Sequence, residues 1–192
     1  MRIDNEMQLS QPFLVHDLVP DFTLEDVWAL PEISGAADDF DALIGLLTST
    51  DPSTSSGPLA DALWKARDLL GRWFGIGEIS SGPQAAADSI SARLPTELIG
   101  SADTISFGRL PFVPLYRTAT EFAAEIENAT VHGVLHLSWL RNSGGSFSPQ
   151  MAVYVKPHGW FGRAYMAFIK PFRYLIVYPA MERTFAQRWA KR

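Results

Sequence analysis

The sequence predicts an α+β fold in which a curved antiparallel sheet holds a long C-terminal helix. Between about residue 94 and residue 156 the hydrophobic residues recur with a period of two, which is typical of strands that bury one face. From residue 157 to residue 192 the period becomes helical, and before residue 94 it is mainly helical as well. Helices and strands are therefore segregated along the chain, as in α+β proteins.

The composition predicts one folded domain over residues 1–192. Hydrophobic residues make up 47% of the 192 residues and include six Trp, which is enough for a substantial core. The chain contains no Cys, which excludes disulfides and thiolate chemistry. The N-terminus lacks the basic and apolar regions of a signal peptide, so we expect a cytoplasmic protein.

The first half of the chain predicts one strand and several helices. The segment FLVHDLV at 13–19 predicts a first strand that Pro20 ends, and Thr23 resembles the N-cap of a short helix that reaches about Leu30. A helical insert after the first strand is expected from the patterns at 38–47, 58–74 and 85–94, with a flexible loop at 48–57.

The second half predicts an antiparallel sheet. Strands are expected at 104–110, 120–127, 130–140 and 147–155. Alternation places Phe122, Leu135, Trp139 and Met151 on apolar strand faces, and the Asn-Ser-Gly-Gly run at 142–145 predicts the turn between the last two strands.

The closing segment predicts a long helix with one aromatic side and one basic side. The aromatic side is expected to lie on the sheet and comprises Phe161, Ala164, Tyr165, Phe168, Ile169, Phe172, Leu175 and Ile176. The opposite side comprises Arg163, Lys170, Arg173, Arg188 and Lys191. Pro171 and Pro179 are expected to kink the helix, because each removes a backbone hydrogen bond.

The charge is unevenly distributed along the chain. Eight of the 16 Lys and Arg residues but only one of the 21 Asp and Glu residues lie from Lys156 onward. The basic side of the helix either meets acidic loops and water or attracts an anionic surface. The acidic body repels phosphates, so we expect no nucleic-acid partner and no stable membrane binding. The oligomeric state is left open.

Two C-terminal motifs and one segment of the predicted sheet resemble a known family. Gly162-Arg163-Ala164-Tyr165, Lys170-Pro171-Phe172-Arg173 and the stretch ENATVHGVLHLSW at 127–139 resemble an uncharacterised bacterial domain of unknown function, whose members end in a similar GR-Y…PFH/R helix. The order of elements over most of the chain resembles the helix-grip superfamily of pollen allergens, START lipid-transfer proteins and polyketide cyclases. The longer helical insert and the two interior prolines depart from that superfamily.

The superfamily resemblance implies a cavity between the sheet and the C-terminal helix. Its expected occupant is a hydrophobic small molecule or lipid, bound without catalysis and without a cofactor or metal. The expected lining is Phe122, Leu135, Trp139, Met151, Tyr165, Phe168 and Phe172. The alternative is a cyclase- or hydrolase-like enzyme that uses Tyr165 or His132 as its acid–base group in that pocket.

The spacing of the His and Glu residues in the predicted sheet indicates no metal site and no pair of catalytic carboxylates. His132 and His136 lie four residues apart on one strand, which places them about 13 Å apart, too far to share a metal ion. Both histidines lie on the sheet face opposite Leu135, where we expect them to point outward or to lie at the rim of the sheet. Glu121, Glu125 and Glu127 are expected on a solvated edge for the same reason of alternation.

Overall fold

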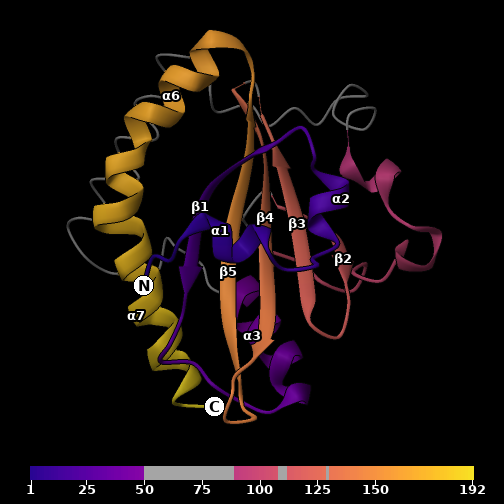
Figure 1. Ribbon diagram of the computed structural model, residues 1–192, viewed down its shortest axis with the longest axis vertical. Coiled ribbons are helices and arrows are strands. Elements are labelled where there is room, and N and C mark those ends of the chain that lie inside the picture. The colour runs from indigo at the N-terminus through magenta and orange to yellow at the C-terminus, as the bar shows by residue number, and fades with distance from the viewer. Residues whose placement is uncertain (50–88, 108–111, 129) are drawn as a thin grey trace.

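Five antiparallel strands form the centre of the molecule, in the order β1–β5–β4–β3–β2 (Figure 1). The computed structural model describes residues 1–49, 89–107, 112–128 and 130–192. The first strand of the chain pairs with the last one, so segments from near both ends of the chain lie side by side in the sheet. The strands are β1 (Thr23–Ala29), β2 (Val113–Arg117), β3 (Glu121–Glu127), β4 (Val131–Arg141) and β5 (Phe147–Pro157). The predicted α+β class is confirmed.

Helices cover both faces of this sheet. In Figure 1, α1 (Asn5–Leu9) and α2 (Val15–Leu18) lie in front of the sheet, and α3 (Phe40–Ser49) lies behind it. Short 3₁₀ helices are η1 (Ala37–Asp39), η3 (Ile90–Arg93) and η4 (Thr96–Leu98). The chain ends with α6 (Gly159–Phe172), the π-helical turn η5 (Arg173–Val177) and α7 (Tyr178–Trp189).

The predicted strands at 120–127, 130–140 and 147–155 are confirmed as β3, β4 and β5, and the helix at 38–47 as α3. The turn between β4 and β5 closes where Asn142 N–H donates to the Ser146 carbonyl at 2.7 Å. Gly145 adopts a φ of 86°, a conformation that favours glycine. The turn chemistry read from the sequence therefore sets the β4–β5 register.

Three predicted elements are wrong. Residues 13–19 contain helix α2 rather than a strand, and residues 23–29 form strand β1 rather than a helix. Antiparallel pairing of β1 with β5 overrides the local capping signal at Thr23. Residues 104–107 form turn and coil instead of a strand, and strand β2 begins at Val113.

Other predictions fall partly or wholly outside the described residues. The helix at 58–74 lies there, as does most of the loop at 48–57. Of the segment at 85–94, the structure describes only the end, where Ile90–Arg93 forms a single 3₁₀ turn.

Each face of the sheet packs against its own hydrophobic cluster. We call the first the α7 face; α3, α7 and the segment around Phe107 cover it, and its strand residues are Trp28, Phe122, Ala124, Leu137, Trp139 and Met151. We call the second the α2 face; α2, η3 and neighbouring loops cover it, and its strand residues are Val27, Leu115, Tyr116, Ala123, Val134, Ala152 and Tyr154. A sheet covered on both sides buries polar strand residues too, and that consequence creates the site described below.

The C-terminal helix is bent, as its prolines predict. The π-helical turn η5 follows Pro171 and separates α6 from α7, which form one bowed column along the β1 side of the sheet (Figure 1). The predicted aromatic side is wrong as a buried stripe, because Phe168 is 57% and Leu175 is 77% exposed. Core contacts come instead from α7, whose buried residues are Tyr178, Phe185 and Trp189. The π turn shifts the helical phase, so one continuous stripe does not describe both helices.

A buried carboxylate anchors this column to β1. Asp26 is fully buried and accepts hydrogen bonds from Arg173, Tyr174 and Tyr178, the last at 2.9 Å. Arg173 therefore does not belong to an exposed basic side, contrary to the prediction. Lys170 and Arg192 also pair with acidic residues of the body, Glu25 and Asp39.

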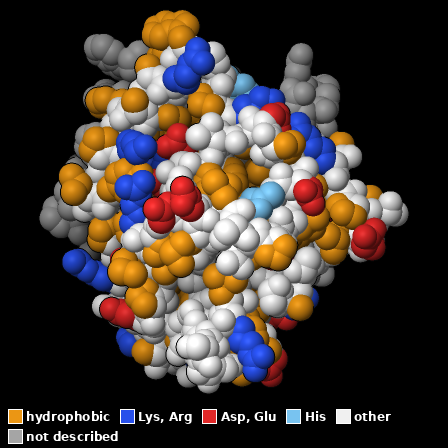
Figure 2. Space-filling view, viewed as in Figure 1, with side chains coloured by type: hydrophobic (Ala, Val, Ile, Leu, Met, Phe, Trp, Pro, Cys, Tyr) orange, Lys and Arg blue, Asp and Glu red, His pale blue; other side chains and the backbone are white. Residues whose placement is uncertain are grey.

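The surface in Figure 2 shows Lys and Arg side chains next to Asp and Glu side chains in several places. Part of the charge separation along the sequence is therefore compensated in the fold. Among the described residues, no helix is both long and apolar enough to cross a membrane.

Candidate functional site

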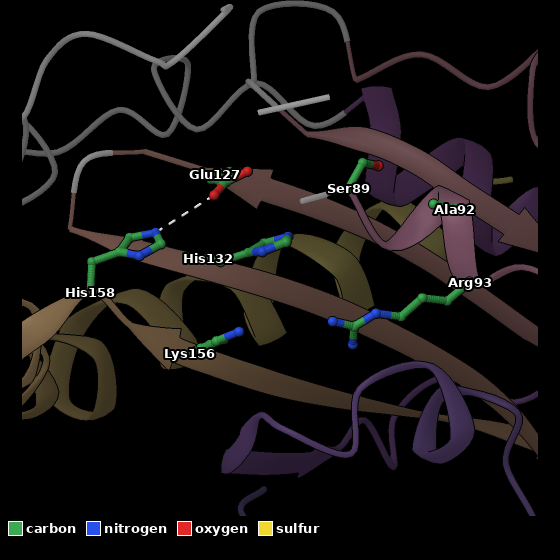
Figure 3. A pocket seen from close by; sticks show the side chains of 7 residues that line it. All are labelled: Ser89, Ala92, Arg93, Glu127, His132, Lys156 and His158. Atoms are coloured by element: carbon green, nitrogen blue, oxygen red, sulfur yellow. Dashed lines mark ion pairs between the residues drawn. The ribbon is translucent and has the colours of Figure 1, made fainter. Parts of the chain in front are cut away.

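A polar pocket opens on the α2 face, at the end of the sheet where β3 ends and β4 begins. Its volume is about 250 Å³, and Figure 3 shows its side chains converging from η3 and from three neighbouring strands. The lining residues are Ser89, Ala92, Arg93, Glu127, His132, Lys156 and His158. Polar and charged side chains dominate the lining, in contrast to the apolar cavity that the superfamily resemblance implies.

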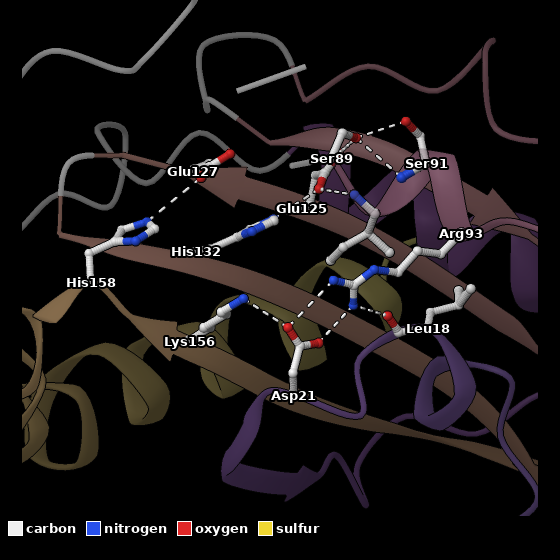
Figure 4. Close-up of polar contacts among 11 residues, drawn as sticks. Leu18, Asp21, Ser89, Ser91, Arg93, Glu125, Glu127, His132, Lys156 and His158 are labelled. Atoms are coloured by element: carbon white, nitrogen blue, oxygen red, sulfur yellow. Dashed lines mark hydrogen bonds and ion pairs between the residues drawn. The ribbon is translucent and has the colours of Figure 1, made fainter. Parts of the chain in front are cut away.

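One carboxylate holds two cations at the pocket wall. Asp21 accepts a hydrogen bond from Arg93 Nη1 at 2.7 Å and another from Lys156 Nζ at 2.8 Å (Figure 4). Arg93 also donates to the Leu18 carbonyl at 2.8 Å. The Arg93 guanidinium and then the Lys156 ammonium hold the pKa of Asp21 well below its usual range. Asp21 is therefore ionised at neutral pH and fixes both cations in place.

A second carboxylate orients the pocket histidine. Glu125 Oε2 lies 3.0 Å from His132 Nε2, and Glu125 also accepts hydrogen bonds from Ser89 Oγ and from Ile90 N–H (Figure 4). Burial alone raises the pKa of Glu125, but the hydrogen bonds from His132, Ser89 and Ile90 outweigh it and lower that pKa. An ionised Glu125 accepts a hydrogen bond from the Nε2–H of His132 and so fixes the orientation of the ring.

The order of the hydrogen bonds among Ser89, Glu125 and His132 determines which chemistry these residues can perform. In a hydrolytic triad the histidine lies between the nucleophile and the carboxylate. Here Glu125 lies between Ser89 and His132, so Ser89 donates to the carboxylate and is not activated as a nucleophile. The arrangement instead provides fixed hydrogen-bonding groups and one oriented imidazole at the pocket wall.

A third pair closes the pocket at its other end. His158, which lies at the N-cap of α6, places Nε2 3.7 Å from Glu127 Oε1. Both side chains keep contact with solvent, since 39% of His158 and 16% of Glu127 is exposed. This contact is long and partly exposed, so it contributes little to stability.

A second polar network lies further along the α2 face, and it is closed to solvent. Glu121 accepts hydrogen bonds from Tyr116 Oη at 3.0 Å and from His136 Nε2 at 3.1 Å. Gln8 Nε2 donates to His136 Nδ1 at 3.1 Å and to Tyr154 Oη at 2.8 Å. Burial lowers the pKa of His136, which is therefore neutral, and this network has a structural role.

The sequence predicted the correct sheet face for the His and Glu residues of these two networks. It wrongly predicted that this face is exposed to solvent. His132 and His136 are 4% and 0% exposed, and Glu121 and Glu125 are 9% and 7% exposed, so none of them lies on a solvated rim. Side chains from the N-terminal segment between Ile3 and Phe22 and from the segment between Ile90 and Leu98 pack on this face. The signal in the sequence was the pairing of Glu and His on neighbouring strands with the same alternation, which brings diagonal cross-strand neighbours together.

None of the residues predicted to bind a ligand lines this pocket. The structure brings Phe122, Trp139 and Met151 together in the core of the α7 face, with Leu135 half-buried beside them. Tyr165 is half-buried and Phe168 is exposed on α6, and the side chain of Phe172 lies outside the described part of the structure.

Within the described residues, no three His, Asp or Glu side chains gather so as to hold a metal ion. The sequence alone does not single out Arg93 and Lys156 as site residues, because they lie 63 residues apart in different elements.

Comparison with protein families gives a match over most of the chain. A family model described as "Protein of unknown function (DUF2867)" matches residues 18–180. No curated protein and no solved structure matches the chain at a significant level. The matched residues include β1 to β5, α6 and all residues of the pocket, whereas α1 lies before the match.

Proposed function

Since the chain belongs to the DUF2867 family of proteins of unknown function, we propose its function from the pocket: it binds a small polar metabolite on the α2 face of the sheet. The observation behind this proposal is the convergence of two cations, two imidazoles and a carboxylate on one cavity of about 250 Å³. Polar groups that converge on a cavity fix the orientation of a ligand.

The pocket groups are held in position before any ligand arrives. Asp21 bridges Arg93 and Lys156, and Glu125 bridges Ser89 and His132. Groups that are already ordered lose little side-chain entropy on binding, which favours affinity. A network that served stability alone would not need a cavity in front of it.

The size of the pocket restricts the ligand. Its 250 Å³ is below the roughly 300–1,000 Å³ of pockets that hold drug-sized molecules. A lipid chain is therefore too large for this pocket, and a small metabolite is the class of ligand that fits.

Native mass spectrometry of protein purified from its source tests the proposal. We expect a small polar molecule to remain bound and to be lost in the Lys156→Met variant. Lys170→Met is the matched control, because Lys170 lies on α6 and pairs with Glu25 away from the pocket. Retention of the same molecule by Lys156→Met, or copurification of an apolar molecule only, would contradict a ligand in this pocket.

A hydrophobic ligand between the sheet and the C-terminal helix is a second candidate, in line with the resemblance to the helix-grip superfamily. One observation favours it: Ile126, Leu135 and Val153 lie on the α7 face of the sheet and are only half-buried. Leu135→Trp would fill space there. We expect it to abolish binding of the apolar dye Nile red, whereas Lys156→Met would leave that binding unchanged. Equal dye binding by wild type and Leu135→Trp would contradict this candidate.

An enzyme that uses His132 as its acid–base group is the alternative within the polar pocket. The favouring observation is the orientation of the ring by its hydrogen bond to Glu125. Tyr165, the other acid–base residue considered from the sequence, lies on α6 and does not line this pocket. His132→Gln would then retain the bound metabolite and lose its conversion.

A further inference from the structure

The rotation of α6 about its own axis is fixed by a close contact with the sheet. Gly162 has no room for a Cβ, because that atom would meet the backbone carbonyl of Thr130, next to the start of β4. Position 162 therefore faces the sheet. An α-helix turns by about 100° per residue, so Trp160 and Ala164 lie roughly 160° around the helix from Gly162 and face away from the sheet.

The side of α6 that faces away from the sheet is apolar. We call it the outer stripe; its residues are Trp160, Ala164, Ala167, Pro171 and, one turn later in η5, Leu175, and all five are exposed. Trp160 is 75% exposed and Leu175 is 77% exposed. At 1.5 Å per residue, the stripe is about 22 Å long. A helix side that faces water normally carries polar residues, so this stripe indicates a surface that contacts another molecule.

Basic side chains border the outer stripe. On a helix with about 100° per residue, Arg163 and Lys170 lie roughly 60° and 80° from Trp160, in the same direction around the helix. Both basic residues are exposed. Lys170 pairs with Glu25 at 3.7 Å, and within the part of the chain that the structure describes no acidic side chain pairs with Arg163. An apolar stripe with a basic border is the pattern of helices that lie in the surface of an anionic membrane.

The second half of the helical column adds basic charge. Arg183 and Lys191 are exposed. From residue 157 onward the only acidic residue is Glu182, and its carboxylate pairs with the amino group of Met1. The column of α6, η5 and α7 lies beyond β1, at the edge of the described part of the molecule (Figure 1). Apolar and basic groups therefore meet on one outward surface.

An anionic lipid surface fits these groups better than two other occupants. A two-fold symmetric contact with a second copy through the outer stripe would bring the basic borders of both copies together. A nucleic acid would contact the Arg and Lys side chains but leave Trp160 and Leu175 in water. A membrane surface uses both kinds of group, because its headgroups attract Lys and Arg and its interface takes up Trp and Leu side chains.

The acidic body of the protein does not prevent such a contact. The sequence predicts no stable membrane binding because most of the acidic charge lies before Lys156. At physiological salt, charges separated by more than about 8 Å are largely screened from one another. The charge of the surface that touches the membrane, rather than the net charge of the chain, therefore governs the contact. Weak and reversible docking is compatible with the absence of stable binding.

We propose that the outer stripe docks this protein reversibly on an anionic membrane surface. Trp160 and Leu175 lie at the boundary between headgroups and acyl chains, and Arg163 contacts the anionic headgroups. The helix lies in the plane of the membrane and does not cross it. This docking is independent of the polar pocket, since no residue of the outer stripe lines that pocket.

Vesicle flotation of the full-length protein tests the proposal. One set of vesicles contains phosphatidylcholine and phosphatidylserine in equal amounts, and the other contains phosphatidylcholine alone. We expect the protein to float with the mixed vesicles at low salt and to float less with phosphatidylcholine alone. Salt at about 0.15 M should reduce flotation without abolishing it, because it screens the Arg and Lys contacts but not the apolar ones.

A double substitution tests the apolar part of the contact. Trp160→Ser combined with Leu175→Ser should lower the partition coefficient for mixed vesicles at least about tenfold, which corresponds to about 1.4 kcal/mol. Met7→Ser combined with Ile99→Ser is the matched control. It removes two apolar side chains that are 57% and 65% exposed outside α6, and it should leave the partition coefficient unchanged.

A charge-removing substitution tests the basic border. Arg163→Gln should weaken partitioning at low salt about fivefold, which corresponds to about 1 kcal/mol. Arg141→Gln is its control, because Arg141 is exposed at the end of β4 and not on α6. Thermal melting of each variant confirms that it folds.

Fluorescence quenching by brominated lipids gives a measurement that keeps the outer stripe apolar. Trp160→Phe should float as the wild type does, since Phe also enters the membrane interface. Brominated lipids should quench the wild-type protein more strongly than Trp160→Phe, because only the wild type has an indole at the membrane.

Three results would overturn the proposal. The first is no flotation with mixed vesicles at low salt, and the second is equal flotation of the wild type and the double Ser variant. The third is a wild-type dimer in native mass spectrometry that the double Ser variant converts to a monomer, because the outer stripe would then be an interface between copies of the chain.

Discussion

Gln8 Nε2 lies 3.1 Å from His136 Nδ1, so the N-terminal helix reaches the centre of the sheet across 128 residues of chain. Because the Gln8 amide donates to Nδ1, the His136 ring carries its proton on Nε2 and donates it to Glu121 at 3.1 Å. Gln8 lies before residues 18–180, which match the family model. A residue outside the matched region thus determines the tautomer of a histidine within it.

Gln8→Leu is expected to destabilise the protein by about 1–3 kcal/mol, since it leaves buried polar partners without hydrogen bonds. The partners are His136 Nδ1, the Tyr154 hydroxyl and the Gln150 amide. Urea denaturation measures the free energy of unfolding. Gln11→Leu is the control, because Gln11 is exposed and only three residues away. Equal unfolding free energies for the two variants would show that the network contributes nothing to stability.

Stability is expected to fall in acid, beginning below about pH 6.5. Burial depresses the pKa of His136 from its ordinary value of 6.5, so the unfolded chain binds this proton more readily than the folded one. Such a group stabilises the fold above pH 6.5 and loses that contribution as the pH decreases. The pKa of Glu121 is also lowered from its ordinary value of 4.5. Burial alone would raise this pKa, but the hydrogen bonds to Glu121, chiefly the one from His136, outweigh burial. The contribution of Glu121 to stability is therefore lost at a lower pH than that of His136.

Unfolding free energies at a series of pH values check the histidine contribution. His136→Gln should show a smaller loss between pH 6.5 and about pH 5 than the wild type. His158→Gln should retain the wild-type loss, because the His158 side chain is 39% exposed. Parallel curves for wild type and His136→Gln would assign the acid sensitivity to other groups.

The spacing of hydrophobic residues along the sequence predicted those helices and strands whose spacing fits only one type of secondary structure. Strands β3 to β5 followed from alternation around residues such as Phe122 and Leu137, and the helical period predicted α3. Strand β1 was missed because Leu24, Val27 and Trp28 are spaced as suitably for a helix. The pairing of Val27 with Ala152, which no local window contains, decides its state.

The pocket was harder to predict for a related reason. Its two bridges join residues far apart in sequence: Asp21 lies 135 residues from Lys156 and 72 residues from Arg93. Alternation correctly placed His132 on the α2 face. It could not show that helices cover that face as well, and burial is what turns surface Glu and His residues into oriented pairs.

Asp26→Asn is expected to destabilise the protein by about 3–5 kcal/mol, because it leaves the Arg173 guanidinium buried without its carboxylate. Burial, and then hydrogen bonding to the Asp26 carboxylate, raises the pKa of Tyr174 to about 12, which reflects the same cluster. Thermal and urea unfolding measure the loss. Glu25→Gln is the control on the same strand: its pair with Lys170 spans 3.7 Å with the lysine half exposed, and about 0–1 kcal/mol is expected. Losses of equal size would mean that the Asp26 cluster anchors the C-terminal helices no better than a surface pair.

Two glycine substitutions should shift stability in opposite directions. A Cβ at Gly162 would lie 2.2 Å from the Thr130 carbonyl oxygen, a backbone atom at the start of β4. Gly162→Ala must therefore push α6 away from the sheet, at a cost of about 1–3 kcal/mol. This close approach gives a physical reason for glycine in the Gly162-Arg163 motif.

Gly45 in α3 has open space where its Cβ would lie, so Gly45→Ala should stabilise the helix by about 0.5–1 kcal/mol. The melting temperature should fall for Gly162→Ala and rise for Gly45→Ala. The His158 backbone N–H also donates to the Thr130 carbonyl, at 2.8 Å, so displacement of α6 moves one wall of the polar pocket. Gly162→Ala should consequently weaken ligand binding in the pocket, whereas Gly45→Ala should not. A Gly162→Ala protein with unchanged stability would show that α6 does not require this contact with β4.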